Sequence, residues 1–244
     1  EWTRCLKETG GMDEVHLLRQ YNFYDEKIKS IHKKVVVIVS DALRYEVAQE
    51  LIGELAKTRH IASLKPAIAM LPSETKYSKP SLLPHRELKL YGKGEEQGMA
   101  VDDHILDTTQ KRSEHLQVYR DGAVCVPFET VAEYNQEKNH EIFKHPLVYI
   151  FHDVIDKTGH DGNAKQIVNS CRDAITELKR MIPTIHASYS VTEVYVTSDH
   201  GFLFNDIMFA DKDKHKIEED YLERSTRYYL TKSKDEVSGV VKFP

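Results

Sequence analysis

Two patterns of apolar residues alternate along the chain and predict its secondary structure. Short runs that are apolar at nearly every position are typical of buried strands, and they cover residues 35–40, 61–70, 123–128, 147–151 and a run from residue 194. Apolar residues spaced three or four apart predict helices over residues 44–57 and 166–185, and Pro183 is expected to end the second. Strands and helices in alternation indicate an α/β fold, a mostly parallel sheet with helices on both faces.

The remaining segments indicate how the 244 residues are organised. Residues 1–34 are charged and aromatic with helical spacing, so we expect a helical lead-in segment before one domain over residues 35–244. Residues 91–122 are polar and rich in glycine, which is typical of an insertion or cap. The chain begins at Glu1 without an initiator methionine, and we take it to be a fragment of a longer protein.

Composition narrows the class of protein. A net charge of −5 and a pI near 6.2 argue against an overall electrostatic attraction to nucleic acid, but they do not exclude a local basic patch. No apolar run is long enough to span a bilayer and no secretory signal opens the chain, so no membrane partner is expected. The three cysteines are odd in number and widely separated, which indicates small core residues in a reducing cytoplasm rather than a disulfide framework.

Acidic and imidazole side chains follow three of the predicted strands. Asp41 comes directly after the first strand, Asp199 and His200 follow the last, and Asp156 and His160 come shortly after residues 147–151. Parallel strands end along one edge of a sheet, where α/β folds keep their ligand sites, and carboxylates with imidazoles are typical metal ligands. The set therefore predicts a metal site. Two alternatives stay open: Asp41 as a helix N-cap, and residues 156–162 as a polar surface loop.

A segment rich in hydroxyl groups spans residues 71–79. A hydroxyl at the start of a helix lies near unpaired backbone N–H groups that favour an anion. If a metal ion also binds the hydroxyl, its pKa falls and it becomes a competent nucleophile at neutral pH. Ser73, Thr75 and Ser78 all qualify by their chemistry. The alternative is that these residues only cap the helix.

Four sequence blocks carry a resemblance to a known family. In chain order they are Val35-Val-Val-Ile-Val-Ser-Asp-Ala-Leu-Arg-Tyr45, Leu71-Pro-Ser-Glu-Thr-Lys-Tyr-Ser with Leu82-Leu-Pro-His85, Asp156-Lys-Thr-Gly-His160 and Thr197-Ser-Asp-His-Gly-Phe202. Together they resemble the PglZ domain of the alkaline phosphatase superfamily, whose members hydrolyse phosphate and sulfate esters with bound metal ions. The resemblance covers roughly residues 33–205 and implies an alkaline-phosphatase-like core.

The resemblance also implies the roles of site residues. Superfamily members usually hold two zinc ions, sometimes manganese. The ligands implied here are Asp41, Thr75, Asp199 and His200 for one ion, and Asp156 and His160 for the other. Thr75 is the implied nucleophile, because phosphodiesterases of the superfamily carry Pro-Thr-x-Thr and Pro72-Ser-Glu-Thr75 aligns with that motif. Its attack on phosphorus would form a phosphothreonine that water then hydrolyses.

The match departs from the superfamily at one ligand. The second metal ion normally takes another histidine that follows the Asp–His pair. Downstream of His200 the only histidine is His215, which lies in a charged stretch. Whether His215 completes the second site is left open by the sequence.

The setting of the family suggests substrates and partners. PglZ proteins belong to bacterial phage defence in Pgl and BREX gene clusters, so the resemblance implies a phosphodiesterase of nucleotides or nucleic acid that works with other defence proteins. The alternative function is a catalytically weak or inactive domain that serves as an interaction platform in a defence complex.

Overall fold

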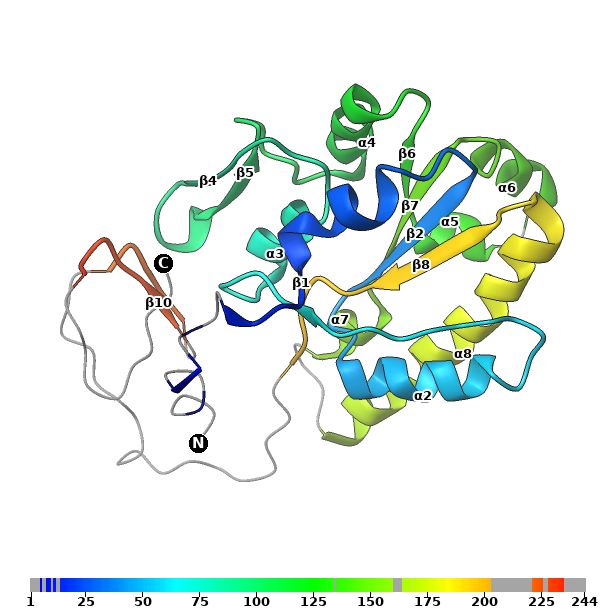
Figure 1. Ribbon diagram of the computed structural model, residues 1–244, viewed down its shortest axis with the longest axis horizontal. Coiled ribbons are helices and arrows are strands. Elements are labelled where there is room, and N and C mark those ends of the chain that lie inside the picture. The colour runs from blue at the N-terminus through cyan, green and yellow to red at the C-terminus, as the bar shows by residue number, and fades with distance from the viewer. Residues whose placement is uncertain are drawn as a thin grey trace.

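The computed structural model describes residues 5, 8–9, 11, 14–133, 135–159, 164–202, 221–225 and 228–234. Its centre is a parallel sheet in the order β6-β7-β2-β8 (Figure 1). The strands are β2 (Val35–Ser40), β6 (Val124–Pro127), β7 (Leu147–His152) and β8 (Glu193–Thr197). The predicted α/β fold with a mostly parallel sheet is confirmed.

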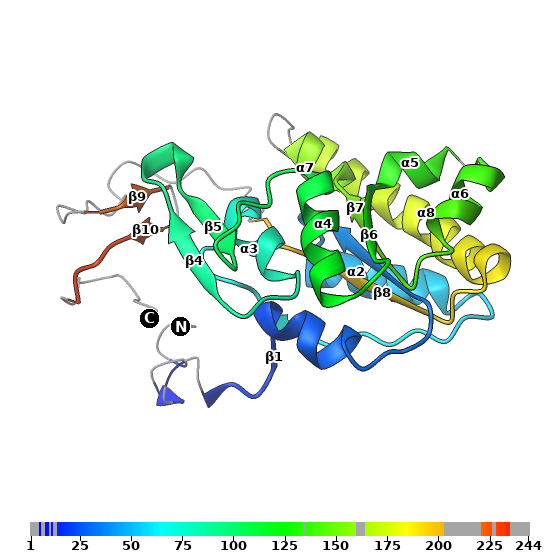
Figure 2. The same ribbon diagram turned by 90° about the horizontal axis from the view of Figure 1, so that it is seen from above.

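The two faces of the sheet carry separate apolar cores. Alternate residues of β2 point to opposite faces, so Val36 and Ile38 join one core while Val35, Val37 and Val39 join the other. The first core packs against α2 (Tyr45–Leu55) and α8 (Ala164–Tyr189), and the second against α4 (Thr109–Tyr119) and the N-terminal helical turns. Figure 2 shows α4 and α8 on opposite sides of the sheet.

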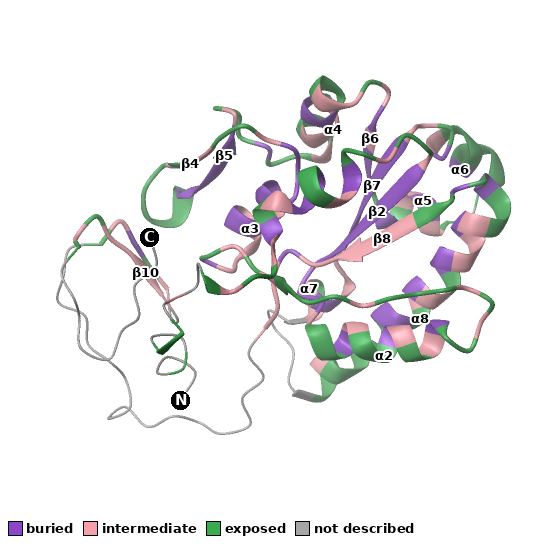
Figure 3. Cartoon of the chain, viewed as in Figure 1, coloured by how far each residue is buried: buried purple, intermediate pink, exposed green. Residues whose placement is uncertain are grey.

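Burial follows this layering. Strands β2 and β7 are buried along their whole length, as Figure 3 shows, because each has a strand on both sides and a core on both faces. Strand β8 is only half-buried. Full burial on both faces explains why β2 and β7 are apolar runs without alternation.

The N-terminal segment, expected as a helical lead-in, is only partly helical. It contains β1 (Leu18–Arg19), a 3-10 helix over Gln20–Asn22 and a π-helical turn over Tyr24–Ile28. Phe23, Tyr24 and Ile28 are buried in the second core. This segment therefore covers one face of the sheet.

Two predictions about elements were wrong. The expected strand over residues 61–70 is only β3 (Ala67–Ile68), which pairs with β1 outside the central sheet. Pro66 interrupts that run, and Ile61 is fully exposed, so the residues before Pro66 form no strand and only Ala67 and Ile68 pair. Pro183 was expected to end a helix, but α8 continues to Tyr189. The lost backbone hydrogen bond is offset because Ile185 and Tyr189 are buried in the first core.

The segment over residues 91–122, expected as a polar insertion, divides into two parts. The first is an antiparallel hairpin of β4 (Leu88–Tyr91) and β5 (Gly98–Val101), with a 3-10 helix over Gly94–Glu96 between them. The second contains α4, whose Leu116 is fully buried in the second core together with Leu106. Helix α4 therefore covers the sheet.

Shorter elements complete the described chain: α3 (Thr75–Ser81), α5 (Phe128–Ala132), α6 (Gln136–Ile142), α7 (Val154–Gly159), β9 (Glu223–Arg224) and β10 (Tyr229–Leu230). Strands β9 and β10 pair antiparallel as a hairpin. Helix α3 lies beyond the carboxyl end of β8 (Figure 1). Among the helices that the structure describes, none is both long enough and apolar enough to cross a membrane.

Candidate metal centre

The carboxyl ends of β2 and β8 bring three predicted ligands together. Val39 pairs with Thr197 in the parallel ladder, so the residues that follow these strands emerge side by side. Asp41, Asp199 and His200 each present a ligand atom within 4.8 Å of the others. The Nε2 atom of His200 is 3.2 Å from Oδ1 of Asp41 and 3.9 Å from Oδ2 of Asp199.

Two carboxylate oxygens in this cluster lack hydrogen bonds. Oδ1 of Asp41 and Oδ2 of Asp199 are buried and accept no hydrogen bond from the described residues. Such groups are costly unless a cation compensates them. Two carboxylates and an imidazole are oxygen and nitrogen donors that suit a divalent ion such as zinc or manganese. The residues present therefore fit one divalent metal ion.

Thr75 lies against the same cluster. It is the first residue of α3, and its Oγ1 atom is 2.9 Å from Nε2 of His200. The N-cap position belongs to Glu74, which makes no side-chain capping bond, so the hydroxyl of Thr75 is not used as a cap. Ser78, by contrast, is fully buried and donates its hydroxyl to the carbonyl of Glu74 at 2.6 Å. Of these two hydroxyls, that of Thr75 is the one beside the candidate ligands.

Lys79 completes the cluster, and sequence reasoning missed it. Its Nζ atom is 2.5 Å from Oδ2 of Asp41 and 3.9 Å from Oδ2 of Asp199. Lys79 follows Thr75 by four residues, so both side chains lie on one face of α3. That spacing was the available signal. The ammonium supplies a fixed positive charge beside two buried carboxylates.

The surroundings shift the pKa values of the two acids, Asp41 and Asp199, in opposite directions. Burial alone would raise the pKa of Asp41, but His200 and Lys79 outweigh burial and lower that pKa to about 2. Burial and the neighbouring Asp41 raise the pKa of Asp199 to about 7. Burial would lower the pKa of His200, but the two carboxylates raise it to about 9. Without a metal ion, the raised pKa leaves Asp199 only partly ionised at neutral pH, while Asp41 is fully ionised beside His200 and Lys79.

Backbone contacts fix the position of Asp199. Its Oδ1 atom accepts the backbone N–H groups of His200 at 2.9 Å and of Ala42 at 3.3 Å. Ala42 has a φ of 61°, a strained conformation for alanine that directs its N–H toward Asp199. The buried Gln20 donates to the carbonyls of Ser198 at 2.9 Å and Asp199 at 2.5 Å. Gln20 is a positioning residue that no pattern in the sequence indicated.

The hairpin of β9 and β10 anchors the start of α3. Glu223 accepts hydrogen bonds from Lys76 and from the hydroxyl of Tyr77. On the other side of Thr75, the carboxylate of Glu74 accepts the hydroxyl of Tyr228 at 2.8 Å and that of Ser225 at 3.2 Å. Residues immediately before and after Thr75 are therefore held by a segment about 150 residues downstream.

The predicted second metal site is described only in part. Asp156 lies in α7 and does not belong to the cluster of Asp41, Asp199 and His200. His160 and His215 lie outside the described residues. The second pair of ligands therefore stays a prediction.

Known proteins resemble this chain over most of its length. The family model "BREX system PglZ alkaline phosphatase-like domain" matches residues 23–244. The chain is 33% identical over 207 residues to the alkaline phosphatase-like protein BrxZ of Escherichia coli O9:H4 (strain HS), covering 82% of this chain and 24% of that protein. It is 25% identical over 239 residues to the alkaline phosphatase-like protein PglZ of Bacillus cereus (strain H3081.97), covering 96% of this chain and 27% of that protein.

The chain thus spans about a quarter of the length of these curated relatives. The family match covers nearly all of it and includes every element that supplies the cluster. The chain therefore belongs to the PglZ family of alkaline phosphatase-like domains of BREX systems.

Proposed function

We propose that this domain is a metal-dependent hydrolase of phosphate esters, specifically a phosphodiesterase that acts on nucleotides or nucleic acid. The observation that carries the proposal is the Thr75 hydroxyl, which lies 2.9 Å from His200 beside two buried carboxylate oxygens without hydrogen bonds. A structural cluster would satisfy those oxygens within the protein. Family membership adds that relatives are alkaline phosphatase-like.

Asp41, Asp199 and His200 would hold the first metal ion. A divalent ion there would lower the pKa of the Thr75 hydroxyl and offset the negative charge of the phosphate. His200 and Lys79 keep Asp41 ionised, so the carboxylate stays available as a ligand. Asp156 and His160 would hold the second ion, and zinc or manganese suits both donor sets.

Thr75 would carry the covalent step. Its oxygen attacks phosphorus, the P–O bond to one ester group breaks, and that group leaves with a proton. Water then cleaves the phosphothreonine, which releases the phosphate product and restores the hydroxyl. The hydrogen-bonded anchoring of Glu74, Lys76 and Tyr77 would hold Thr75 in position for both steps.

The three cysteines are free and none is paired in the described structure, which supports a reducing compartment such as the cytoplasm. The family name points to other BREX proteins as partners of the whole protein.

The proposal is tested by metal analysis and by hydrolysis of bis(p-nitrophenyl) phosphate. We expect the wild type to contain bound metal and to hydrolyse the diester. Thr75→Ala should keep the metal and lose activity by about 10³-fold or more, because the nucleophile is gone. Asp199→Ala should lose both. Ser73→Ala, a hydroxyl removed from the same segment, is the matched control and should stay active.

Two outcomes would overturn the proposal. If the wild type contains no metal and is as inert as the variants, the domain is an interaction platform. If Thr75→Ala keeps full activity while Ser73→Ala loses it, the nucleophile is Ser73.

A further inference from the structure

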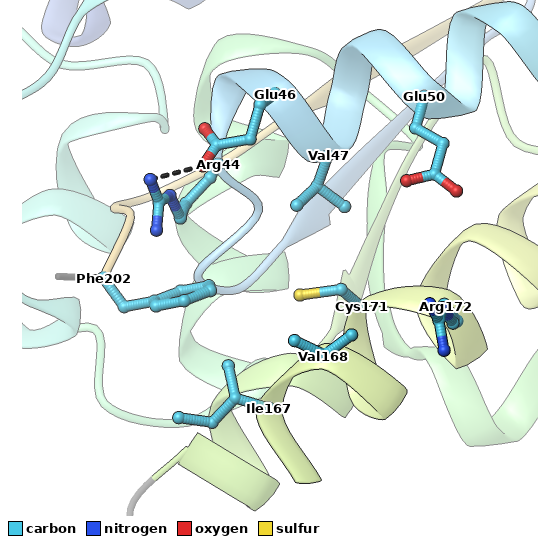
Figure 4. A pocket seen from close by; sticks show the side chains of 9 residues that line it. All are labelled: Arg44, Glu46, Val47, Glu50, Ile167, Val168, Cys171, Arg172 and Phe202. Atoms are coloured by element: carbon cyan, nitrogen blue, oxygen red, sulfur yellow. Dashed lines mark ion pairs between the residues drawn. The ribbon is translucent and has the colours of Figure 1, made fainter. Parts of the chain in front are cut away.

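A groove of about 410 Å³ lies between α2 and α8 (Figure 4). Its volume is within the range typical of small-molecule sites. Its walls are apolar, formed by Val47 on α2 and by Ile167, Val168 and Cys171 on α8. The groove therefore has an apolar wall and room for a small ligand.

One end of the groove carries an aromatic ring and a guanidinium group. Phe202 closes this end, and the guanidinium carbon of Arg44 lies 4.9 Å from the centre of its ring, as the close view in Figure 4 shows. Arg44 also pairs with Glu46. Flat surfaces of this kind stack on planar heterocycles, and such stacking is a common means of holding nucleobases.

The charges at the rim balance. Arg44 and Arg172 face Glu46 and Glu50 around the opening. A rim with two cations and two anions does not attract a polyanionic strand in particular. It does offer hydrogen-bond donors and acceptors to a neutral polar ring, which has both along its edge.

Chain connectivity joins the groove to the metal centre. Arg44 follows Asp41 by three residues, and Phe202 follows His200 by two. A Cβ atom placed on Gly201 would lie 3.3 Å from Cγ of Arg44, so the arginine packs directly over the loop that carries His200. The segments that follow β2 and β8 therefore supply residues both to the groove and to the candidate metal centre.

We propose that this groove is a base-binding subsite, which holds the heterocyclic base of a nucleotide ester while its phosphate lies at the metal centre. The inference rests on the proposed function and narrows it, since it assigns the substrate to the nucleotides. Phe202 and Arg44 provide the stacking surfaces, and Glu46, Glu50 and Arg172 provide edge contacts. Recognition of one base in a slot fits a mononucleotide or the end of a strand.

Cys171 gives a direct measure of occupancy, because its thiol lines the groove. The test measures its alkylation by iodoacetamide, followed by peptide mass spectrometry, in manganese-loaded protein. Burial raises the pKa of this thiol, so the reaction is run at mildly alkaline pH. The exposed Cys5 is an internal control. Adenosine 5′-monophosphate at ten times its dissociation constant should slow labelling of Cys171 by about tenfold and leave Cys5 unchanged.

Matched ligands and variants identify the contacts. Ribose 5-phosphate, which lacks the base, should leave Cys171 labelling unchanged. Phe202→Ala should lose the protection by the nucleotide, and Phe202→Tyr should keep it. Equal protection by both ligands, or protection that persists in Phe202→Ala, would overturn the subsite. So would absence of protection at nucleotide concentrations that saturate binding.

The assay does not need turnover, so it separates this inference from the proposed function. Thr75→Ala should still show protection. If the wild type hydrolyses bis(p-nitrophenyl) phosphate but the nucleotide gives no protection, the subsite is wrong and the proposed function stands. If protection occurs without hydrolysis of any diester, the groove binds nucleotides and the proposed function is wrong.

Discussion

Strands β7 and β8 are both followed by an acid beside an imidazole, yet the two ends differ in whether every buried polar atom has a hydrogen-bond partner. His152 at the end of β7 is buried, and its ring nitrogens are 2.9 Å from Ser40 Oγ and 3.0 Å from Glu177. At the end of β8, the buried carboxylate of Asp199 leaves Oδ2 without a hydrogen bond. The same residue types therefore make a closed network in one place and an open one in the other. The unsatisfied oxygen, more than the presence of acid and histidine, marks the candidate site.

The largest effect is expected when the imidazole of His200, which follows β8, is removed. His200→Ala should reduce the metal content and lower diester hydrolysis by about 10³-fold or more, because a metal ligand and its charge stabilisation are lost. Elemental analysis and steady-state kinetics measure both effects. Retention of metal and activity would show that His200 is not a ligand.

Removal of the imidazole of His152, at the end of β7, should instead lower the stability of the fold. His152→Ala leaves a cavity and unpaired Ser40 and Glu177, so it should lower the free energy of unfolding by about 2–4 kcal/mol. Urea unfolding measures the loss. Metal content per folded molecule should equal that of the wild type. A loss of metal without a loss of stability would show that His152 belongs to the metal site, and would contradict a purely structural role for it.

The acids give a third test, in chelator-treated protein. Asp199→Asn removes a buried charge that Asp41 repels, so it should raise the free energy of unfolding by about 1–3 kcal/mol at neutral pH. Asp153→Asn at the other strand end is the matched control and should give no such gain, because Asp153 is partly exposed and pairs with Lys157 at 2.9 Å.

The gain should depend on pH with a definite sign. The pKa of Asp199 is raised from 3.8 to about 7 in the folded protein. Its contribution to wild-type stability is therefore fully present below about pH 4 and is lost as the pH rises through about 7. The advantage of Asp199→Asn over the wild type should grow across that window. An advantage that is flat or shrinks there would contradict the assignment of the raised pKa.

The smallest effect concerns the hairpin that anchors α3. Tyr228→Phe removes one hydrogen bond to Glu74, so it should lower the free energy of unfolding by about 0.5–1.5 kcal/mol. If the hairpin positions Thr75, kcat should also fall several-fold while KM and metal content stay unchanged. Tyr221→Phe, at an exposed tyrosine near the same hairpin, is the control. A stability loss with unchanged kcat would make the anchor purely structural.

Much of the fold follows from local pattern. The apolar runs of β2 and β7 predicted buried parallel strands because only strands with cores on both faces carry such runs. The run over residues 61–70 has similar residues, but only Ala67 and Ile68 pair, with β1 outside the central sheet, which a local pattern does not reveal. Likewise, packing of Ile185 and Tyr189 decides that α8 continues past Pro183.

The candidate site was predictable where its residues follow strands. The structure brings together Asp41, Thr75, Asp199 and His200, four of the six residues named from the sequence, although their roles stay predictions. Lys79, Gln20 and Glu223 were missed because each acts through a contact between distant segments. Glutamine and glutamate at such positions look like ordinary polar residues until the fold is known.

The hairpin of β9 and β10 has a consequence for how the protein is made. Thr75, Asp41 and His200 have all been synthesised well before Tyr228 leaves the ribosome. The hydrogen bonds that Tyr228 donates to Glu74, and that Glu223 accepts from Lys76 and Tyr77, form only afterwards. A nascent chain therefore contains Asp41, Thr75 and His200 before it contains the hairpin that anchors α3, so α3 can take its final position only after translation has passed Tyr228.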